Sequence, residues 1–480
     1  MGTTVQAAGK IPKLHILGYG VGALPVNMSF AIVVLYLSYF YTDVFLLPPA
    51  IMAVLFISCR VWDGINDPIM GLIADRTNSS WGKYRPYLLF TPIPMVVFAG
   101  LTFYAPDMGM TAKIIYAFVT YFGLQMIKTA VAVPYFALPA LMTTDATERT
   151  ALSSAAMIFA PVAFIIASVL TLKVVGLFPT EKEGFFYTAL MFTAFSAVFS
   201  FVTFITSRKY DYPGNKLFLR QKTGSGPGSL KEKWKVISQN RPFMLSVGAF
   251  MGHNMYSAVV MGVMIYFFKY NVKAFDRYPS FIGAMLICAM LGAAIAPLLV
   301  RKFGKKSTLQ GANILAICCG LTLFLLSYGK ETAELAPLWR VGGPCFFLFL
   351  LSGFSSNIVP VICAAVMADS VDYGEWKTGR RTQGLISAVF LMGNKAGMAL
   401  GGAFIGIGLT IINYVPNLPK YPSETLQGIL VLLFIVPMGC RILISILMWF
   451  YNLSDSRFAE IVKELNAGVS NSADEVLTTG

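Results

Sequence analysis

The sequence predicts an all-α membrane protein whose twelve transmembrane helices form two six-helix bundles. Hydrophobic residues make up 56% of the 480-residue chain and charged residues only 12%, whereas a soluble protein carries about 25% charged residues. A membrane-spanning helix needs roughly 20 mainly apolar residues. Open sheets would leave backbone groups unpaired in hydrocarbon, so we interpret the apolar runs as helices. The twelve runs lie approximately at 15–41, 49–74, 86–105, 112–141, 151–177, 184–206, 243–269, 279–300, 307–328, 337–367, 382–413 and 425–451.

One polar stretch, 207–241, is much longer than the other gaps and separates six runs from six. Its segment 223–229 consists of Thr, Gly, Ser and Pro, which is typical of a flexible linker. A plain solvated loop is the alternative interpretation. We predict an N-terminal bundle at 1–206, a basic cytoplasmic linker at 207–241, a C-terminal bundle at 242–452 and a cytoplasmic tail at 453–480.

The net charge of +14 is spread over short gaps between the apolar runs and does not form a patch. This pattern argues against nucleic acid as a partner and makes the lipid bilayer the expected environment. Lys and Arg gather in the gaps on one side of the membrane if the helices alternate, so both termini are expected to be cytoplasmic. The segment Met1–Lys13 lacks a signal-peptide core, and the first run is expected to be a retained helix. The seven cysteines fall in or beside apolar runs and are interpreted as core residues.

The second run contains two acids, and ionisable groups inside a span are functional by default. Asp63 and Asp67 are four residues apart, so both lie on one helix face, and Asn66 adds an oxygen there. Neighbouring carboxylates repel unless a cation lies between them. Pro68 has no N–H, which frees the carbonyl of Gly64. These oxygens predict a site for a hard cation, with Na⁺ held at Asp63 and Asp67 if the protein is sodium-coupled.

The fourth run contributes Thr129, whose hydroxyl oxygen can join the same cation site. The alternative is structural pairing, in which Arg60 neutralises one of the acids. Lys128 either balances the acid pair or holds an anionic substrate group, and the sequence does not separate these roles. Lys395 lies mid-span in the eleventh run and is therefore expected to face the core, where it either completes the charge balance of the acid pair or contacts solute. Gly393 and other small neighbours allow other helices to approach closely.

A segment rich in charges, 368–381, joins the tenth and eleventh runs on the cytoplasmic side. We expect its ion pairs with other cytoplasmic ends to close one side of the carrier and to break in the other half-cycle. A solvated turn is the alternative. The candidate gate residues are Arg60, Arg149, Asp369, Asp372, Glu375 and Arg380.

No enzyme signature, phosphate-binding loop or Cys/His cluster is present, so we expect neither catalysis nor a cofactor. With two histidines in the chain, His253 is interpreted as a core residue, although Asn254 beside it is a candidate for the solute path. A membrane sensor that binds solute without moving it is one rival function. A proton-coupled exporter of amphipathic compounds is a second.

The short basic turn after the second run recurs after the eighth. Gly71, Asp75 and Arg76 precede 83–86, and Arg301–Lys306 is the counterpart in the second half. This repetition resembles the pattern of a major-facilitator carrier, which implies the major-facilitator fold.

Four longer motifs resemble the glycoside–pentoside–hexuronide:cation symporter family, which includes melibiose permease and the glucuronide carrier. They are Tyr41-Thr-Asp-Val44, Arg60-Val-Trp-Asp-Gly-Ile-Asn-Asp-Pro-Ile-Met-Gly71, Trp81-Gly-Lys-Tyr-Arg-Pro86 and Ala368-Asp-Ser-Val-Asp-Tyr-Gly-Glu375, within about 14–460. The resemblance implies sugar uptake coupled to Na⁺, Li⁺ or H⁺. It also implies a cation site at Asp63, Asn66, Asp67 and Thr129, and matches Lys395 to the family's lysine in helix eleven.

The sugar site departs from that of the melibiose carrier. Asn27 and Ala132 stand where that carrier has acids, Met157 stands at its arginine, and Phe136 at its stacking tryptophan. Fewer acids beside Lys128 make the pocket more positive, so we hypothesise an anionic sugar, either a uronide or a sulfonated sugar such as sulfoquinovose. A neutral glycoside or pentoside is the alternative. The candidate substrate residues are Asn27, Lys128, Phe136, Asn254, Asn394 and Lys395.

These interpretations predict a secondary transporter in the bacterial inner membrane that imports a sugar with a coupling cation. We expect it to function as a monomer. Its partners would be a small sugar or sugar acid, Na⁺ or H⁺, and lipid.

Overall fold

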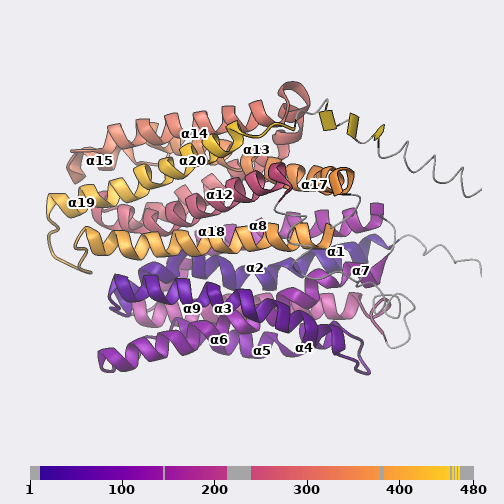
Figure 1. Ribbon diagram of the computed structural model, residues 1–480. Helices are drawn as coiled ribbons and strands as arrows, with labels where there is room; N and C mark the ends of the chain where they lie inside the picture. Colours follow the sequence, from indigo (N-terminus) through magenta and orange to yellow (C-terminus); the bar gives the residue numbers. More distant parts are fainter. Residues whose placement is uncertain are drawn as a thin grey trace, which may run out of the picture. The chain divides into compact units, whose positions relative to one another are not determined.

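Helices account for nearly all regular structure in the computed structural model, which describes residues 11–143, 146–212, 239–378 and 383–453 and a few residues from 457 to 464. The described chain groups into two compact units (Figure 1). Unit 1 comprises 1–226 with 278–283 and 409–419, and unit 2 comprises the remainder. The predicted domain bounds stay a prediction, because most of the linker lies outside the described residues.

Six long helical stretches of unit 1 correspond to the first six apolar runs. The first run is divided into several pieces, and Thr91 interrupts the third between α4 and α5. The elements are α1 (Lys13–Val21), α2 (Ala23–Ile32), η1 (Val33–Leu37), η2 (Phe40–Val44), α3 (Pro49–Arg76), α4 (Arg85–Phe90), α5 (Pro92–Thr102), α6 (Met110–Ala137), α7 (Pro139–Met142), α8 (Ala146–Val175) and α9 (Glu181–Thr206).

Six further stretches follow the linker, and most of their length belongs to unit 2. The tenth run reaches further than predicted, because α17 continues to Thr378. The elements are α12 (Arg241–Tyr266), η3 (Phe267–Asn271), η4 (Phe275–Arg277), α13 (Tyr278–Phe303), α14 (Lys305–Ser327), α15 (Thr332–Leu338), α16 (Pro344–Ser356), α17 (Ile358–Thr378), α18 (Gln383–Ile411), α19 (Ser423–Leu430), η5 (Val431–Ile435) and α20 (Val436–Trp449).

Nine helical stretches among the described residues are long and apolar enough to cross a membrane. The other three long stretches are α3, α4 with α5, and α12. In α3 the buried charges lower the hydropathy, and in α12 His253 and Asn254 lower it. Large apolar side chains also point outward, such as Ile93 at 71% and Leu298 at 68% exposure. Such a surface is suited to lipid and would be a liability in water.

Unit 1 is held together by aromatic stacking and by hydroxyl groups that bridge helices. The rings of Tyr19 and Tyr135 stack with centroids 4.7 Å apart, and the Tyr135 hydroxyl donates to the Tyr19 carbonyl at 3.0 Å. Thr203 of α9 donates to the carbonyl of Gly18 at 2.8 Å. A Cβ on Gly22 would lie 2.4 Å from the Thr203 hydroxyl, so glycine is required where α9 approaches this closely.

The turn between α3 and α4 is fixed by one buried carboxylate. Asp211, 1% exposed, accepts the backbone N–H groups of Lys83, Tyr84 and Arg85 at 2.7, 2.7 and 2.8 Å. Gly82 has φ +109°, and a Cβ there would lie 2.5 Å from the Asp211 carbonyl oxygen. The basic turn predicted from the sequence is therefore held by a residue more than a hundred positions away.

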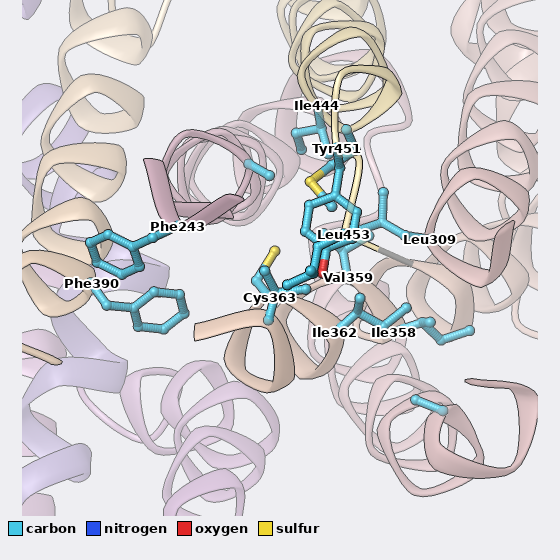
Figure 2. Packing of buried hydrophobic residues seen from close by; sticks show 14 of the residues in the cluster. Phe243, Leu309, Ile358, Val359, Ile362, Cys363, Phe390, Ile444, Tyr451 and Leu453 are labelled. Atoms are coloured by element: carbon cyan, nitrogen blue, oxygen red, sulfur yellow. The ribbon is translucent and has the colours of Figure 1, made fainter. Parts of the chain in front are cut away.

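Unit 2 packs around a core contributed by α12, α14, α17, α18 and α20 (Figure 2). Phe250 and Phe390 stack with ring centroids 4.1 Å apart and join α12 to α18. Cys363 is buried in this core, and all seven cysteines of the chain are free. Five of the seven are buried, as the sequence interpretation expected, whereas Cys288 is half-buried and Cys318 is exposed, so the interpretation as core residues is wrong for Cys318.

Candidate functional site

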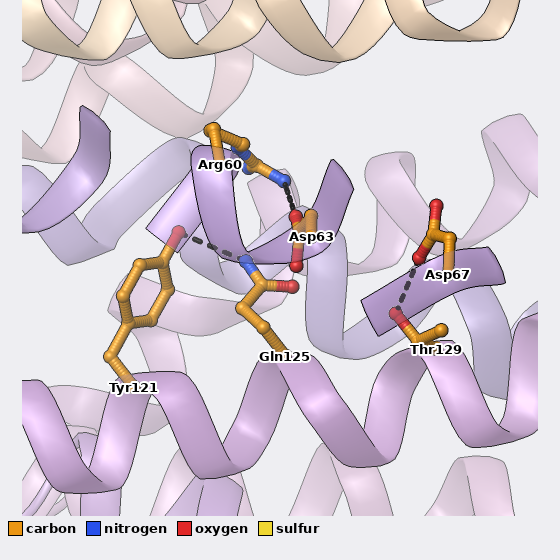
Figure 3. A network of polar contacts seen from close by, with 6 residues as sticks. All are labelled: Arg60, Asp63, Asp67, Tyr121, Gln125 and Thr129. Atoms are coloured by element: carbon orange, nitrogen blue, oxygen red, sulfur yellow. Dashed lines mark hydrogen bonds and ion pairs between the residues drawn. The ribbon is translucent and has the colours of Figure 1, made fainter. Parts of the chain in front are cut away.

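Helix α3 carries both acids, and it runs unbroken through Pro68. Asp63 is 3% exposed, and Asp67, one turn later, is half-buried. Helix α6 packs alongside α3 and supplies the other side chains of the site (Figure 3). Burial in this helix pair makes an uncompensated charge costly, so the partners of each carboxylate decide what the site can bind.

Asp63 has one oxygen paired and one oxygen available. Arg60 Nη1 donates to Asp63 Oδ2 at 2.9 Å, one turn earlier on the same helix (Figure 3). The Asp63 Oδ1 atom is buried and has no hydrogen-bond partner. The structural pairing with Arg60 that the sequence left open is thus present, and it leaves half of the carboxylate without a partner.

Asp67 is joined to α6 by a hydroxyl. The Thr129 Oγ1 atom donates to Asp67 Oδ1 at 3.0 Å (Figure 3). Asn66, 9% exposed, lies between the two acids in the chain, and its Nδ2 atom has no partner. The structure therefore brings Thr129 to Asp67, and the cation site predicted from these residues stays a prediction. Carboxylate, hydroxyl and amide oxygens are the donors that a hard cation such as Na⁺ takes, so the residues suit that ion chemically.

Lys128 lies next to Thr129, but its ammonium forms no ion pair within the part of the chain that the structure describes. Its Nζ atom lies 3.7 Å from the ring centroid of Phe30, on α2. A cation over an aromatic face is attracted by the ring's quadrupole. Of the two roles left open by the sequence, direct pairing with an acid of α3 is not seen in this structure.

Sequence reasoning passed over Gln125, which is 2% exposed and one turn before Thr129 on α6. Its amide nitrogen donates to the Tyr121 hydroxyl at 2.9 Å, beside the Arg60–Asp63 pair (Figure 3). Gln125 is recognisable in the sequence as an amide side chain inside an apolar run. It carries no charge, so it is missed when only ionisable groups inside a span are considered.

The remaining candidate substrate residues of unit 1 are Asn27 and Phe136. The Asn27 amide donates to the Ala23 carbonyl at 2.8 Å within its own helix. Phe136 is 63% exposed and packs edge-on against Tyr135. Neither contacts the acid pair through an interaction seen in this structure.

In unit 2, Asn254 lies on α12, and Asn394 and Lys395 lie half-buried on α18. The Asn254 amide donates to the Phe250 carbonyl at 2.8 Å. A Cβ on Gly397 would lie 2.2 Å from the Met251 carbonyl oxygen, so α12 and α18 are in close contact beside Lys395. The predicted close approach at these small residues is confirmed.

The charged segment after the tenth run is helical and not a connecting turn. Asp369, Asp372 and Glu375 lie on the last turns of α17, because the helix extends to Thr378. Asp369 pairs with Lys305 at the start of α14, within the same unit. The side chain of Arg149 and all of Arg380 lie outside the described residues, so a gate built from these groups stays a prediction.

A solved structure with the same fold supports the helical architecture. The bacterial homolog of the human lysosomal transporter Spinster aligns with a TM-score of 0.63 at 13% identity, covering 96% of this chain and 99% of that one. Within the described residues, no group of three or more His, Cys, Asp or Glu could hold a metal ion. The helical architecture agrees with this fold, and the family match that follows defines the chain as a transporter of the major-facilitator type.

The family model described as "MFS/sugar transport protein" matches residues 18–455, and the chain belongs to that family. It is 31% identical to the isoprimeverose transporter of Lactiplantibacillus pentosus, over 85% of this chain and 82% of that one. It is 30% identical to the putative glycoside/cation symporter YagG of Escherichia coli, over 94% of each. It is 27% identical to the putative sulfoquinovose importer of Escherichia coli, over 94% and 93%. The resemblance to the cation symporter family is confirmed.

Proposed function

We propose that this protein imports an anionic sugar together with Na⁺ or H⁺ across the bacterial inner membrane, by alternating access and with both termini in the cytoplasm. The anionic sugar would be a uronide or a sulfonated sugar. The proposal rests on one observation above all: the ammonium of Lys128 has no ion-pair partner among the described residues, although Lys128 lies on α6, which packs against the acid-bearing helix α3.

The charges of unit 1 explain why cation and sugar would bind together. Asp63 and Asp67 carry two negative charges, and Arg60 and Lys128 carry two positive charges. A bound cation alone leaves this buried group with an excess positive charge, and a bound anion alone leaves an excess negative charge. The two together keep it neutral, which avoids the cost of burying net charge. Each ligand therefore strengthens the binding of the other, reciprocally.

The chain's own residues would divide the work as follows. Asp67, oriented by the Thr129 hydroxyl, and the unpartnered Asp63 oxygen accept the cation. Arg60 holds the second Asp63 oxygen and prevents the two carboxylates from repelling each other across the helix turn. Lys128 moves from the Phe30 ring to the acidic group of the sugar.

Uptake by proteoliposomes tests the proposal. Purified protein would be given labelled glucuronide or sulfoquinovose with an inward Na⁺ or proton gradient. The variant Lys128→Gln is expected to lose at least tenfold of sugar-acid uptake, which is about 1.4 kcal/mol of lost interaction. Asp67→Asn is expected to abolish accumulation.

Lys113→Gln is the matched control. Lys113 lies on the same helix, and its ammonium also faces an aromatic ring, 5.3 Å from the centroid of Phe45. This variant should keep normal uptake. Sugar-acid uptake that Lys128→Gln leaves unchanged, or uptake confined to neutral sugars, would contradict the anionic substrate.

A glycoside without an acidic group is the second candidate substrate, favoured by the 31% identity to an isoprimeverose transporter. In that case Lys128 serves to balance the charge of the α3 acids. Neutral glycosides would then be accumulated, and Lys128→Gln would reduce cation dependence without changing sugar preference.

A further inference from the structure

Unit 2 contains a buried charge that neither the motifs nor the proposed transport cycle uses. Arg441 lies on α20, is 1% exposed, and falls inside the apolar run predicted at 425–451. An ionisable group at such a position is expensive and is a candidate functional site by default.

The guanidinium of Arg441 is only partly satisfied by protein groups. Its Nη1 atom donates to Asn313 Oδ1 of α14 at 3.1 Å, and its central carbon lies 3.8 Å from the ring centroid of Tyr256 on α12. The Nε and Nη2 atoms are buried without a hydrogen-bond partner. Within the described part of the chain, no carboxylate lies within ion-pair distance of Arg441. The charge is therefore buried without a counter-charge, which is a strongly unfavourable state.

A small cavity adjoins this guanidinium. It has a volume of about 30 Å³, and its polar lining groups are Arg441, Tyr256 and Ser352. A single water needs about 10–15 Å³ by the same measure, so the cavity accommodates one monatomic anion or about two waters.

The polar lining of the cavity can donate hydrogen bonds and includes no acid. The Ser356 hydroxyl has one proton and two acceptors within reach, the Ser352 carbonyl at 2.7 Å and the Tyr256 oxygen at 2.9 Å. The contact between Tyr256 and Ser352 is long, at 3.5 Å, and satisfies neither hydroxyl well. Arg441, Tyr256 and Ser352 thus line one space, and two of the guanidinium nitrogens have no acceptor among the described protein groups.

We propose that Arg441, Tyr256 and Ser352 form a binding site for a chloride-sized monovalent anion inside unit 2. The anion neutralises Arg441 and accepts the hydrogen bonds that no protein group accepts. All residues that line the site belong to unit 2.

The test uses the full-length protein in detergent, with sodium held constant and chloride exchanged for gluconate. Radioactive chloride binding by scintillation proximity is expected to reach one ion per chain. The thermal unfolding midpoint is expected to rise by about 2–4 °C in chloride relative to gluconate, because the ion binds only the folded state.

Arg441→Met is expected to reduce chloride binding at least tenfold and to remove the chloride-dependent shift, and Ser352→Ala is expected to weaken both. Arg301→Met, which removes an exposed arginine of α13, should behave as the wild type. If Arg441→Met does not fold, chloride binding to the wild type still decides the question. No bound chloride in the wild type, or an unchanged chloride response in a folded Arg441→Met, would mean that water alone fills the cavity.

Discussion

The two units differ in whether their buried charges have partners of opposite sign. In unit 1, Arg60, Asp63, Asp67 and Lys128 form a group with two charges of each sign on adjoining helices. In unit 2, Arg441 is buried beside an amide and an aromatic ring, with no carboxylate in ion-pair contact among the described residues. A group with equal positive and negative charge stays neutral when it binds one cation together with one anion, and it is neutral again after both have left. A solitary cation can only hold an anion, which suits a permanent structural role.

The largest effect is expected from removing the Arg60 side chain. Arg60→Met leaves Asp63 as an uncompensated buried carboxylate, which costs about 3–5 kcal/mol. Arg441→Met removes a charge that has no protein counter-charge, so in chloride-free buffer its cost should be well below that of Arg60→Met. Thermal unfolding of both variants in gluconate measures the difference.

The double variant Arg60→Met with Asp63→Asn serves as the control, because it removes both members of the pair. It should recover most of the stability lost in Arg60→Met. Equal destabilisation by the two single arginine variants would remove the contrast between the units.

A further buried charge in unit 1, the carboxylate of Asp211, accepts its hydrogen bonds from backbone N–H groups. Asp211→Ala deprives the N–H groups of Lys83, Tyr84 and Arg85 of their acceptor, at a cost of about 2–3 kcal/mol. The expected result is a lower unfolding midpoint and faster proteolysis at the turn between α3 and α4. Asp276→Ala, at an exposed aspartate, should leave both unchanged. A wild-type midpoint in Asp211→Ala would mean that water replaces the carboxylate.

A smaller effect is expected from the hydroxyl beside Asp67. Thr129→Val removes one hydrogen bond to a charged group, so the coupling cation should bind about tenfold more weakly, or about 1.4 kcal/mol. The dependence of sugar uptake on the concentration of the coupling cation measures this change in cation affinity. Thr120→Val is the matched control on the same helix, since its hydroxyl donates only to carbonyls of that helix. An identical change in both variants would assign the loss to helix packing.

The smallest effect is expected outside the membrane. Lys182 pairs with Asp107 at 2.8 Å, nearly the Arg60–Asp63 distance, but the side chains are 46% and 90% exposed. The lysine lowers the pKa of the Asp107 carboxyl by hydrogen bonding and charge. Because the folded-state pKa is depressed, any stabilisation is complete above the ordinary aspartate range and is lost as pH falls through the folded-state pKa.

Asp107→Asn should therefore change the midpoint at pH 7 by less than about 1 °C, because solvent screens an exposed pair. The midpoints of variant and wild type should coincide at low pH. A shift comparable to that of Arg60→Met would show that burial does not decide the value of these ion pairs.

The sequence alone determined which residues share a helix face and which segments lie in the membrane. The spacing of Asp63 and Asp67 in a long run required that both carboxylates lie on one side of α3, because the helix period is fixed. The charge content and the run lengths required helices in a bilayer. The sequence also indicated Thr129 as an oxygen donor in the fourth run, and the structure places its hydroxyl 3.0 Å from Asp67.

Only the tertiary structure decided the partners that come from distant parts of the chain. Phe30 beneath Lys128, Asp211 on the turn at Lys83, and Asn313 beside Arg441 are each separated from their partners by many residues. Periodicity fixes the face of a helix but not which helix covers that face. The partners, and therefore the charges left for ligands, are set by packing between helices and cannot be read from spacing along the chain.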